Sequence, residues 1–238
     1  PIMKHKESLQ DLIRNNDTVI LVGGTGCGKT VKTPQFIREI MEPGDKLIVT
    51  EPRQINASSI AAHVAFESGV ELGKEIGFKH GGEENVSDDS DTIFQTEGTL
   101  IQQIMNDKDG LLRGVSHIMV DEVHIRTKDT EKLLVFLKEI QKKRKEVGMK
   151  PLKIIAASAT VDEEELKRYF DGAPIEKVPG RTHPITYHQQ PTAVENMPQE
   201  SARIIKELEE GGKPGDVVIG VAGIKDQNGI DTHAQAIQ

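Results

Sequence analysis

Several residue types are scarce in this 238-residue sequence, and each scarcity excludes a class of protein. The single cysteine, Cys27, excludes internal disulfides and cysteine-based metal sites. Tryptophan is absent and aromatic residues make up 3%, which argues against extensive stacking of bases on aromatic side chains. No apolar run approaches the roughly 18 residues that a membrane helix needs, so we expect no membrane partner.

An excess of basic residues is also missing. The net charge is −8 and the isoelectric point is about 5.5. Nucleic-acid-binding proteins often carry a basic face, so the overall charge argues mildly against such a partner. It does not exclude one, because backbone contacts need only a local groove with Lys, Arg and N–H donors. Residues 1–6 contain no apolar stretch long enough for a signal peptide, so we expect a cytoplasmic protein.

One stretch carries most of the chemical information. It reads G-G-T-G-C-G-K-T and fits the phosphate-loop pattern G-x-x-x-x-G-K-[ST]. An apolar run precedes it and a helical pattern follows it, so Lys29 would reach the β- and γ-phosphates and the Thr30 hydroxyl would bind Mg²⁺. The predicted nucleotide-binding residues are Gly23, Gly24, Thr25, Gly26, Cys27, Gly28, Lys29 and Thr30. The alternative interpretation is a glycine-rich turn without a ligand.

Apolar runs alternate with helical patterns along most of the chain. The predicted strands are 18–22, 46–50, 76–79, 92–96, 117–122, 152–157 and 216–221. The predicted helices are 2–15, 30–40, 55–68, 99–105, 129–147 and 199–210, and 81–90 is predicted as a solvated loop. Near-continuous apolar strands that alternate with helices are typical of an α/β fold with a parallel sheet covered on both faces. Ligands on such sheets bind at the carboxyl ends of the strands.

Two adjacent carboxylates, Asp121 and Glu122, end one of these apolar strands about ninety residues after Lys29. A P-loop enzyme uses one acidic residue in the Mg²⁺ shell and places another residue to orient the attacking water. Asp121 and Glu122 fit these two tasks. The alternative is a pair of solvated carboxylates without a catalytic task.

Several short segments, taken in order, resemble the motifs of the DEAH-box family of superfamily 2 helicases. Beside the phosphate loop, they are Pro34-Gln35, Glu51-Pro52-Arg53-Gln54 (family Q-P-R-R), Thr96-Glu97-Gly98 (T-[DE]-G), Asp121-Glu122-Val123-His124 (D-E-A-H), Ser158-Ala159-Thr160 (S-A-T), 178–182 (P-G-R-T) and 215–218. The resemblance implies a RecA-like ATP-binding domain over 1–177, a connector over 178–198, and the truncated start of a second RecA-like domain over 199–238.

The resemblance also implies roles for residues of the nucleotide site. Lys29, Glu122 and His124 would be catalytic, with Glu122 orienting the water and His124 linking the nucleotide site to the second domain. Thr30 and Asp121 would hold Mg²⁺.

A second group of residues would face the nucleic acid. The resemblance assigns Arg53, Thr96 and Gly98 to the phosphates of a single strand, so binding should depend on salt and little on base sequence. The S-A-T residues Ser158, Ala159 and Thr160 would couple hydrolysis to movement on the strand.

The function that follows from the resemblance is that of an NTP-dependent helicase core. Its cofactors would be ATP, or another NTP, and Mg²⁺. Its partners would be single-stranded RNA, with DNA left open, and the rest of the second RecA-like domain of a longer chain; RNA depends on family analogy alone.

The sequence lacks the family's late arginine motif, Q-R-x-G-R-x-G-R. An arginine finger is typically worth about 10³–10⁵ in rate, so we expect this chain alone to bind nucleotide and hydrolyse it slowly. Two alternatives stay open: another P-loop NTPase, such as a kinase or a secretion motor, and a non-catalytic scaffold that binds nucleotide.

Overall fold

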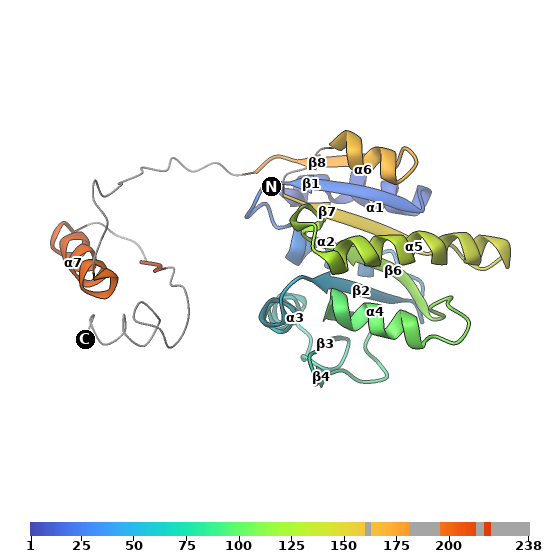
Figure 1. The fold of residues 1–238 in the computed structure, drawn as a ribbon, viewed down its shortest axis with the longest axis horizontal. Coiled ribbons are helices and arrows are strands. Elements are labelled where there is room, and N and C mark those ends of the chain that lie inside the picture. Colours follow the sequence, from blue (N-terminus) through green and yellow to red (C-terminus); the bar gives the residue numbers. More distant parts are fainter. Residues whose placement is uncertain (160–162, 181–195, 213–216, 220–238) are drawn as a thin grey trace. The chain divides into compact units, whose positions relative to one another are not determined.

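The computed structural model describes residues 1–159, 163–180, 196–212 and 217–219, and the chain divides into two units, Pro1–Thr182 and His183–Gln238. The first unit contains an eight-stranded sheet in the order β4-β3-β5-β2-β6-β7-β1-β8 (Figure 1). Its strands are β1 (Thr18–Gly23), β2 (Lys46–Glu51), β3 (Ile76–His80), β4 (Glu83–Asn85), β5 (Thr92–Thr96), β6 (Val115–Val120), β7 (Lys153–Ser158) and β8 (Ile175–Val178).

Helices connect these strands. In the first unit they are the 3₁₀ helices η1 (Ile2–His5) and η2 (Val123–Ile125) and the α-helices α1 (Lys6–Asn15), α2 (Lys29–Arg38), α3 (Gln54–Ser68), α4 (Glu97–Asn106), α5 (Lys128–Glu146) and α6 (Glu163–Tyr169). Every strand pair is parallel except β3 with β4. The predicted α/β fold with a mainly parallel sheet is therefore confirmed.

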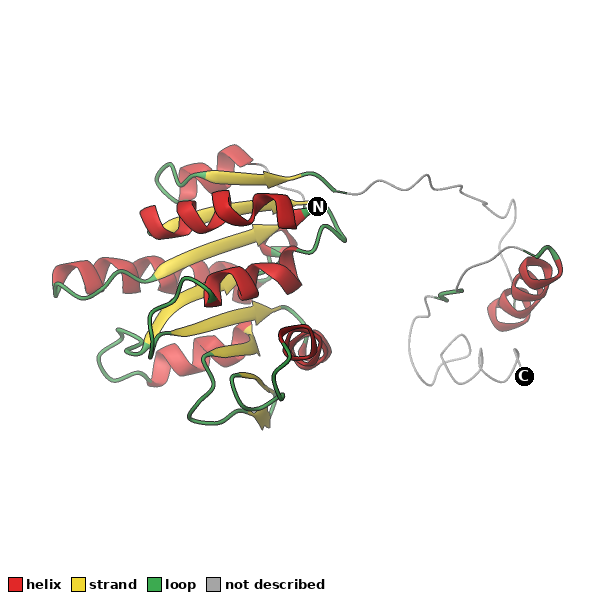
Figure 2. Cartoon of the chain, turned by 180° about the vertical axis from the view of Figure 1, so that it is seen from behind, coloured by secondary structure: helices red, strands yellow, loops and turns green. Residues whose placement is uncertain are grey.

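The sheet lies between two layers of helices, because consecutive strand residues point to opposite faces. On β1, Leu21 joins the apolar core beneath α1, α2 and α3, and its neighbour Ile20 joins the core beneath α4, α5 and α6. Figure 1 shows α4, α5 and α6 in front of the sheet, and Figure 2 shows the opposite face. Both faces are covered, as predicted, which explains why the strands read as nearly continuous apolar runs.

The first unit differs from the prediction in several elements. The strand predicted at 117–122 is β6 (Val115–Val120), so Asp121 and Glu122 follow the strand and are not part of it. The predicted loop 81–90 contains β4, which pairs with β3 although all three of its side chains are exposed. An exposed edge strand is held by backbone hydrogen bonds, so its polar sequence shows no strand pattern. The elements α6 and β8 were not predicted, since seven and four residues are too short for a clear period.

The second unit contributes one described helix, α7 (Met197–Glu210). It begins two residues before the predicted start at 199, and the Asn196 side chain caps it by accepting the Gln199 N–H at 3.1 Å. Half of the strand expected at 216–221 and most of the connector expected at 178–198 lie outside the described residues, and 217–219 are in no strand. The domain boundaries stay a prediction. None of the described helices has the length and apolarity to cross a bilayer.

Candidate nucleotide site

The glycine loop joins β1 to α2 at the carboxyl edge of the sheet. Gly26 and Gly28 take positive φ angles of 75° and 96°, which glycine adopts without the steric cost of a side chain. Gly28 precedes the first helical residue, Lys29, so the loop ends at a helix N-terminus with unpaired N–H groups. Such a terminus favours phosphate. Cys27 is buried beside Gly23, which identifies it as a packing residue of the loop.

The loop also lies against the segment that follows β8. In the register of β1 and β8, Gly23 is paired with Val178. Just beyond this pair, a Cβ built on Gly24 would lie 3.3 Å from the Cα of Gly180. The backbone at Gly180 therefore approaches the phosphate loop too closely to leave much room for side chains at Gly24 or Gly180.

The fold brings the phosphate loop and the Asp121–Glu122 pair together. The Lys29 Nζ lies 3.2 Å from Glu122 Oε1, and the Thr30 hydroxyl donates to Asp121 Oδ2. Asp121 is fully buried, and its other oxygen accepts the Glu122 N–H at 2.8 Å. Lys29 and Glu122 are 93 residues apart in sequence, so the parallel sheet alone makes them neighbours.

The backbone of the second acidic residue, Glu122, has an unusual conformation. Glu122 has φ 53° and ψ 37°, in the left-handed region that residues with a side chain seldom adopt. Arg126, after η2, has φ 50°. Such backbone strain is common at active sites.

The histidine of the same motif connects the acid pair to the S-A-T segment. The His124 Nδ1 lies 3.1 Å from Glu122 Oε2 and 3.4 Å from the Ala159 backbone nitrogen. This ring nitrogen can either donate to the carboxylate or accept the Ala159 N–H, depending on the tautomer. Ser158 is buried at the end of β7. Thr160, the third residue of the motif, lies outside the described residues. The structure thus places His124 between two predicted functional segments.

The structure adds one acidic residue, Glu51, to the site. In the sequence, Glu51 was notable only as part of the segment that resembles Q-P-R-R. Glu51 ends β2, which is hydrogen-bonded to β6, and its residue surface is 1% exposed. Burial, with the negative charges of Asp121 and Glu122, raises the pKa of Glu51 from 4.5 to about 8. Among the described residues, its Oε1 has no hydrogen-bond partner. Its position after an apolar strand was the signal that could have identified it.

The oxygen atoms of this site suit a magnesium ion. Mg²⁺ takes hard oxygen ligands, keeps several waters, and commonly uses one or two carboxylates with substrate phosphates. The Thr30 hydroxyl and the Asp121 carboxylate lie in contact at the start of α2. Burial is the main cause of the raised pKa of Asp121, which indicates a carboxylate poorly compensated by its protein neighbours. A divalent cation would supply that compensation.

The predicted nucleic-acid residues lie on the same edge of the sheet. Arg53 immediately precedes α3, and Thr96 caps α4 by accepting the Thr99 N–H at 3.4 Å. Gly98 is in the first turn of α4. The register of β2 and β5 pairs Glu51 with Thr96, so the starts of α3 and α4 are adjacent. Whether these residues bind nucleic acid stays a prediction.

Two comparisons with known proteins bear on this site. The family described as DEAD/DEAH box helicase matches residues 4–169. The chain is 40% identical over 195 residues to the human ATP-dependent RNA helicase DHX33, an alignment that covers 80% of this chain and 27% of that protein. The chain is likewise 40% identical over 195 residues to the mouse ATP-dependent RNA helicase DHX33, an alignment that covers 28% of that protein. The chain therefore spans about a quarter of the length of these relatives.

Proposed function

This chain belongs to the DEAD/DEAH box helicase family, and we propose that it is the ATP-binding part of the motor core of an RNA helicase. The observation that carries the proposal is the meeting of Lys29 and Thr30 with Asp121 and Glu122 at the carboxyl edge of the sheet. The names of the relatives support ATP and RNA as the ligands.

Nucleotide binding would rearrange the contacts of this edge. The ammonium group of Lys29 now faces Glu122 at 3.2 Å, and a γ-phosphate would offer it a partner with more charge. Once Lys29 turned to the phosphates, the Glu122 carboxylate would be free to accept a hydrogen bond from the attacking water and orient it. Thr30 and Asp121 would hold Mg²⁺, which when bound neutralises charge on the phosphates.

The same geometry offers a way to pass the state of the nucleotide to the strand. His124 contacts both Glu122 and the Ala159 N–H, so a shift of the Glu122 carboxylate changes the surroundings of the S-A-T segment. Arg53, Thr96 and Gly98 would hold the backbone of the single strand at the same edge. A cytoplasmic location stays a prediction.

The first test is nucleotide binding by this chain with Mg²⁺, comparing a slowly hydrolysed ATP analogue with ADP. Lys29→Ala should weaken binding by roughly a hundredfold, since it removes a charged donor to phosphate. The matched control is Lys153→Ala, which removes a partly buried lysine of β7 and should leave affinity unchanged. Equal affinity of the wild type and Lys29→Ala would contradict the assignment of the phosphate loop.

A second experiment separates the candidate substrates and functions. Binding of single-stranded RNA and of single-stranded DNA should be compared with the ATP analogue present, and a preference for RNA is expected.

This chain alone should hydrolyse ATP slowly, because its sequence lacks the arginine motif that completes such sites in the family. Rapid RNA-stimulated turnover by the monomeric chain would contradict that expectation. A full-length protein that binds nucleotide and never hydrolyses it would favour the scaffold alternative.

A further inference from the structure

The glutamate of the T-E-G motif, Glu97, is held from another helix. It is the first residue of α4, and its residue surface is 4% exposed. The Thr127 hydroxyl donates to Oε2 at 2.9 Å, and the Thr130 hydroxyl donates to Oε1 at 2.6 Å. Both carboxylate oxygens of a buried acid are thus bound by residues thirty or more positions away in sequence. Neither the phosphate loop nor the Asp121–Glu122 pair uses this residue.

Both donors belong to the start of α5. Thr127 is the N-cap of that helix, and its side-chain oxygen accepts the Thr130 N–H at 2.9 Å. The two threonine hydroxyls are 2.8 Å apart. Glu97 therefore completes a cap made of two threonines, and a carboxylate at two helix N-termini is favoured by both helix dipoles. Figure 1 shows α4 and α5 lying next to each other on one face of the sheet.

The two helices that Glu97 joins carry different functional segments. Residues Thr96 and Gly98, on either side of Glu97, are the predicted contacts to nucleic acid. Helix α5 follows directly on the segment that contains Asp121, Glu122 and His124. A displacement of the start of α4 by a bound strand would therefore reach this segment through Thr127.

A further contact brings the two helix starts close. A Cβ built on Gly98 would lie 3.7 Å from Oδ2 of Asp129, in the first turn of α5. The starts of α4 and α5 therefore approach each other at Gly98 as well as at Glu97.

We propose that Glu97 is a positioning residue that couples strand binding to nucleotide turnover by tying the start of α4 to the start of α5. This inference rests on the proposed function. Its chemistry is two hydroxyl-to-carboxylate hydrogen bonds, and such charge-assisted bonds are stronger than neutral ones. Loss of both would let the two helix starts move independently.

The test is steady-state ATP turnover of the full-length protein across a range of single-stranded RNA concentrations. Glu97→Ala should lower the RNA-stimulated rate by roughly tenfold, the effect of losing a charged hydrogen bond, and raise the RNA concentration needed for half-stimulation. Turnover without RNA should stay within about twofold of the wild type. Thr130→Val, which removes one donor at constant shape, should act in the same direction, and Glu97→Gln should recover part of the stimulation.

The chain offers a matched control for this substitution. Glu176 on β8 also binds two donors from another part of the chain, since its oxygens lie 2.6 Å from His5 Nδ1 and 2.7 Å from the Ser8 hydroxyl. Glu176→Ala should leave the ratio of stimulated to unstimulated turnover unchanged. Equal losses of both rates in Glu97→Ala and Thr130→Val, together with a lower melting temperature, would show a purely structural role and overturn the inference.

The two proposals fail in different ways. A wild-type protein without any RNA stimulation would overturn the proposed function and this inference with it. A wild-type protein with clear stimulation, and variants Glu97→Ala and Thr130→Val that keep its ratio, would overturn this inference alone.

Discussion

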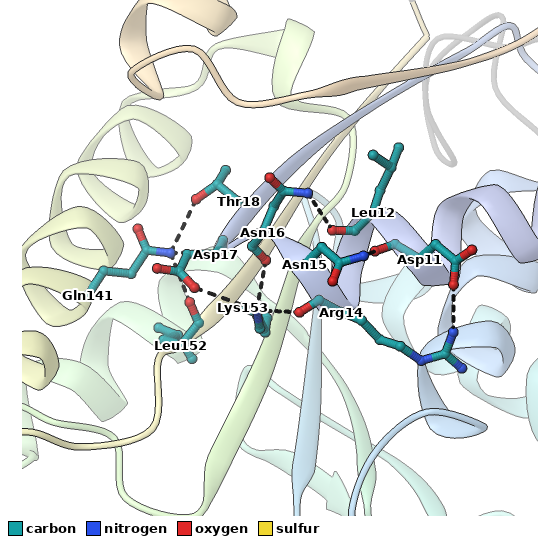
Figure 3. A network of polar contacts seen from close by, with 10 residues as sticks. All are labelled: Asp11, Leu12, Arg14, Asn15, Asn16, Asp17, Thr18, Gln141, Leu152 and Lys153. Carbon is teal, nitrogen blue, oxygen red and sulfur yellow. Dashed lines mark hydrogen bonds and ion pairs between the residues drawn. The ribbon is translucent and has the colours of Figure 1, made fainter.

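The two ends of the sheet treat polar side chains in opposite ways. At the amino ends of β1 and β7, side chains bind backbone carbonyls (Figure 3). Lys153 donates to the carbonyls of Arg14 and Asn16 at 3.2 and 2.9 Å. Gln141 donates to the carbonyls of Asp17 and Leu152 at 3.0 and 2.8 Å. These contacts satisfy backbone carbonyls at the ends of helices and strands, and both partners of each hydrogen bond belong to the protein.

At the carboxyl ends, charged side chains are buried close to one another. Glu51, Asp121 and Glu122 lie near a single lysine, Lys29, and the pKa of both Glu51 and Asp121 is raised. Burying charge without full compensation costs stability. One end of the sheet therefore stabilises the fold, and the other holds acidic groups that a divalent cation would compensate.

The largest expected difference between the ends is in catalysis. Glu122→Gln should lower ATP turnover of the full-length protein by roughly 10²–10⁴-fold, the usual effect of losing a residue that positions or deprotonates water. Nucleotide binding should persist, because Lys29 and the glycine loop are intact. The measurement is steady-state turnover with Mg²⁺ and single-stranded RNA.

The control for this variant is the corresponding replacement of an acid by its amide at the amino end of the sheet. Asp17→Asn alters an exposed carboxylate 3.5 Å from Lys153 and should leave turnover unchanged. If both substitutions lowered turnover alike, the contrast between the two ends would be wrong. If neither did, the catalytic assignment of Glu122 would be wrong.

Much of the fold could be predicted because its signals are local. The apolar runs of the central strands, the glycine loop before α2 and the two acids after β6 are each visible within ten residues or so. The parallel arrangement then places the carboxyl ends together, which is why Lys29 and Glu122 could be expected to meet.

The remainder depends on contacts between distant segments. The sequence around Glu51 offers only its position after an apolar strand, and nothing near Glu97 shows that its carboxylate is buried, because its two donors come from α5. The edge strands β4 and β8 were not predicted for a related reason. Their pairing uses backbone groups, which every residue has, so the side chains leave no pattern.

The second prediction concerns the pH dependence of stability, without nucleotide or divalent cations. The pKa of Glu51 is about 8 in the folded chain and about 4.5 when unfolded, so the folded state holds an extra proton between these values. Its contribution to stability is complete below pH 4.5 and is lost as the pH rises to 8. The free energy of unfolding should therefore fall by up to about 1.4 kcal/mol per pH unit, and Glu51→Gln should flatten this slope.

A buried histidine at the amino end of the sheet determines the pH range in which this slope should be measured. Burial lowers the pKa of His117 from 6.5 to about 4, so the unfolded chain binds more protons between these values. That contribution rises with pH and opposes the effect of Glu51 below pH 6.5. Urea unfolding between pH 6.5 and 8 isolates the acidic end. A wild-type slope that Glu51→Gln leaves unchanged would show that Glu51 is not protonated in this range.

The smallest expected effect is at the amino end, where Lys153→Met keeps the apolar stem and removes the ammonium group. The variant loses the bonds to the carbonyls of Arg14 and Asn16, and should be less stable by about 1 kcal/mol. Its affinity for the ATP analogue should match the wild type, because the lysine is at the far end of the strands from the glycine loop. Urea unfolding and nucleotide titration of the same sample measure both. A change in affinity without a change in stability would mean that the two ends of the sheet are not independent.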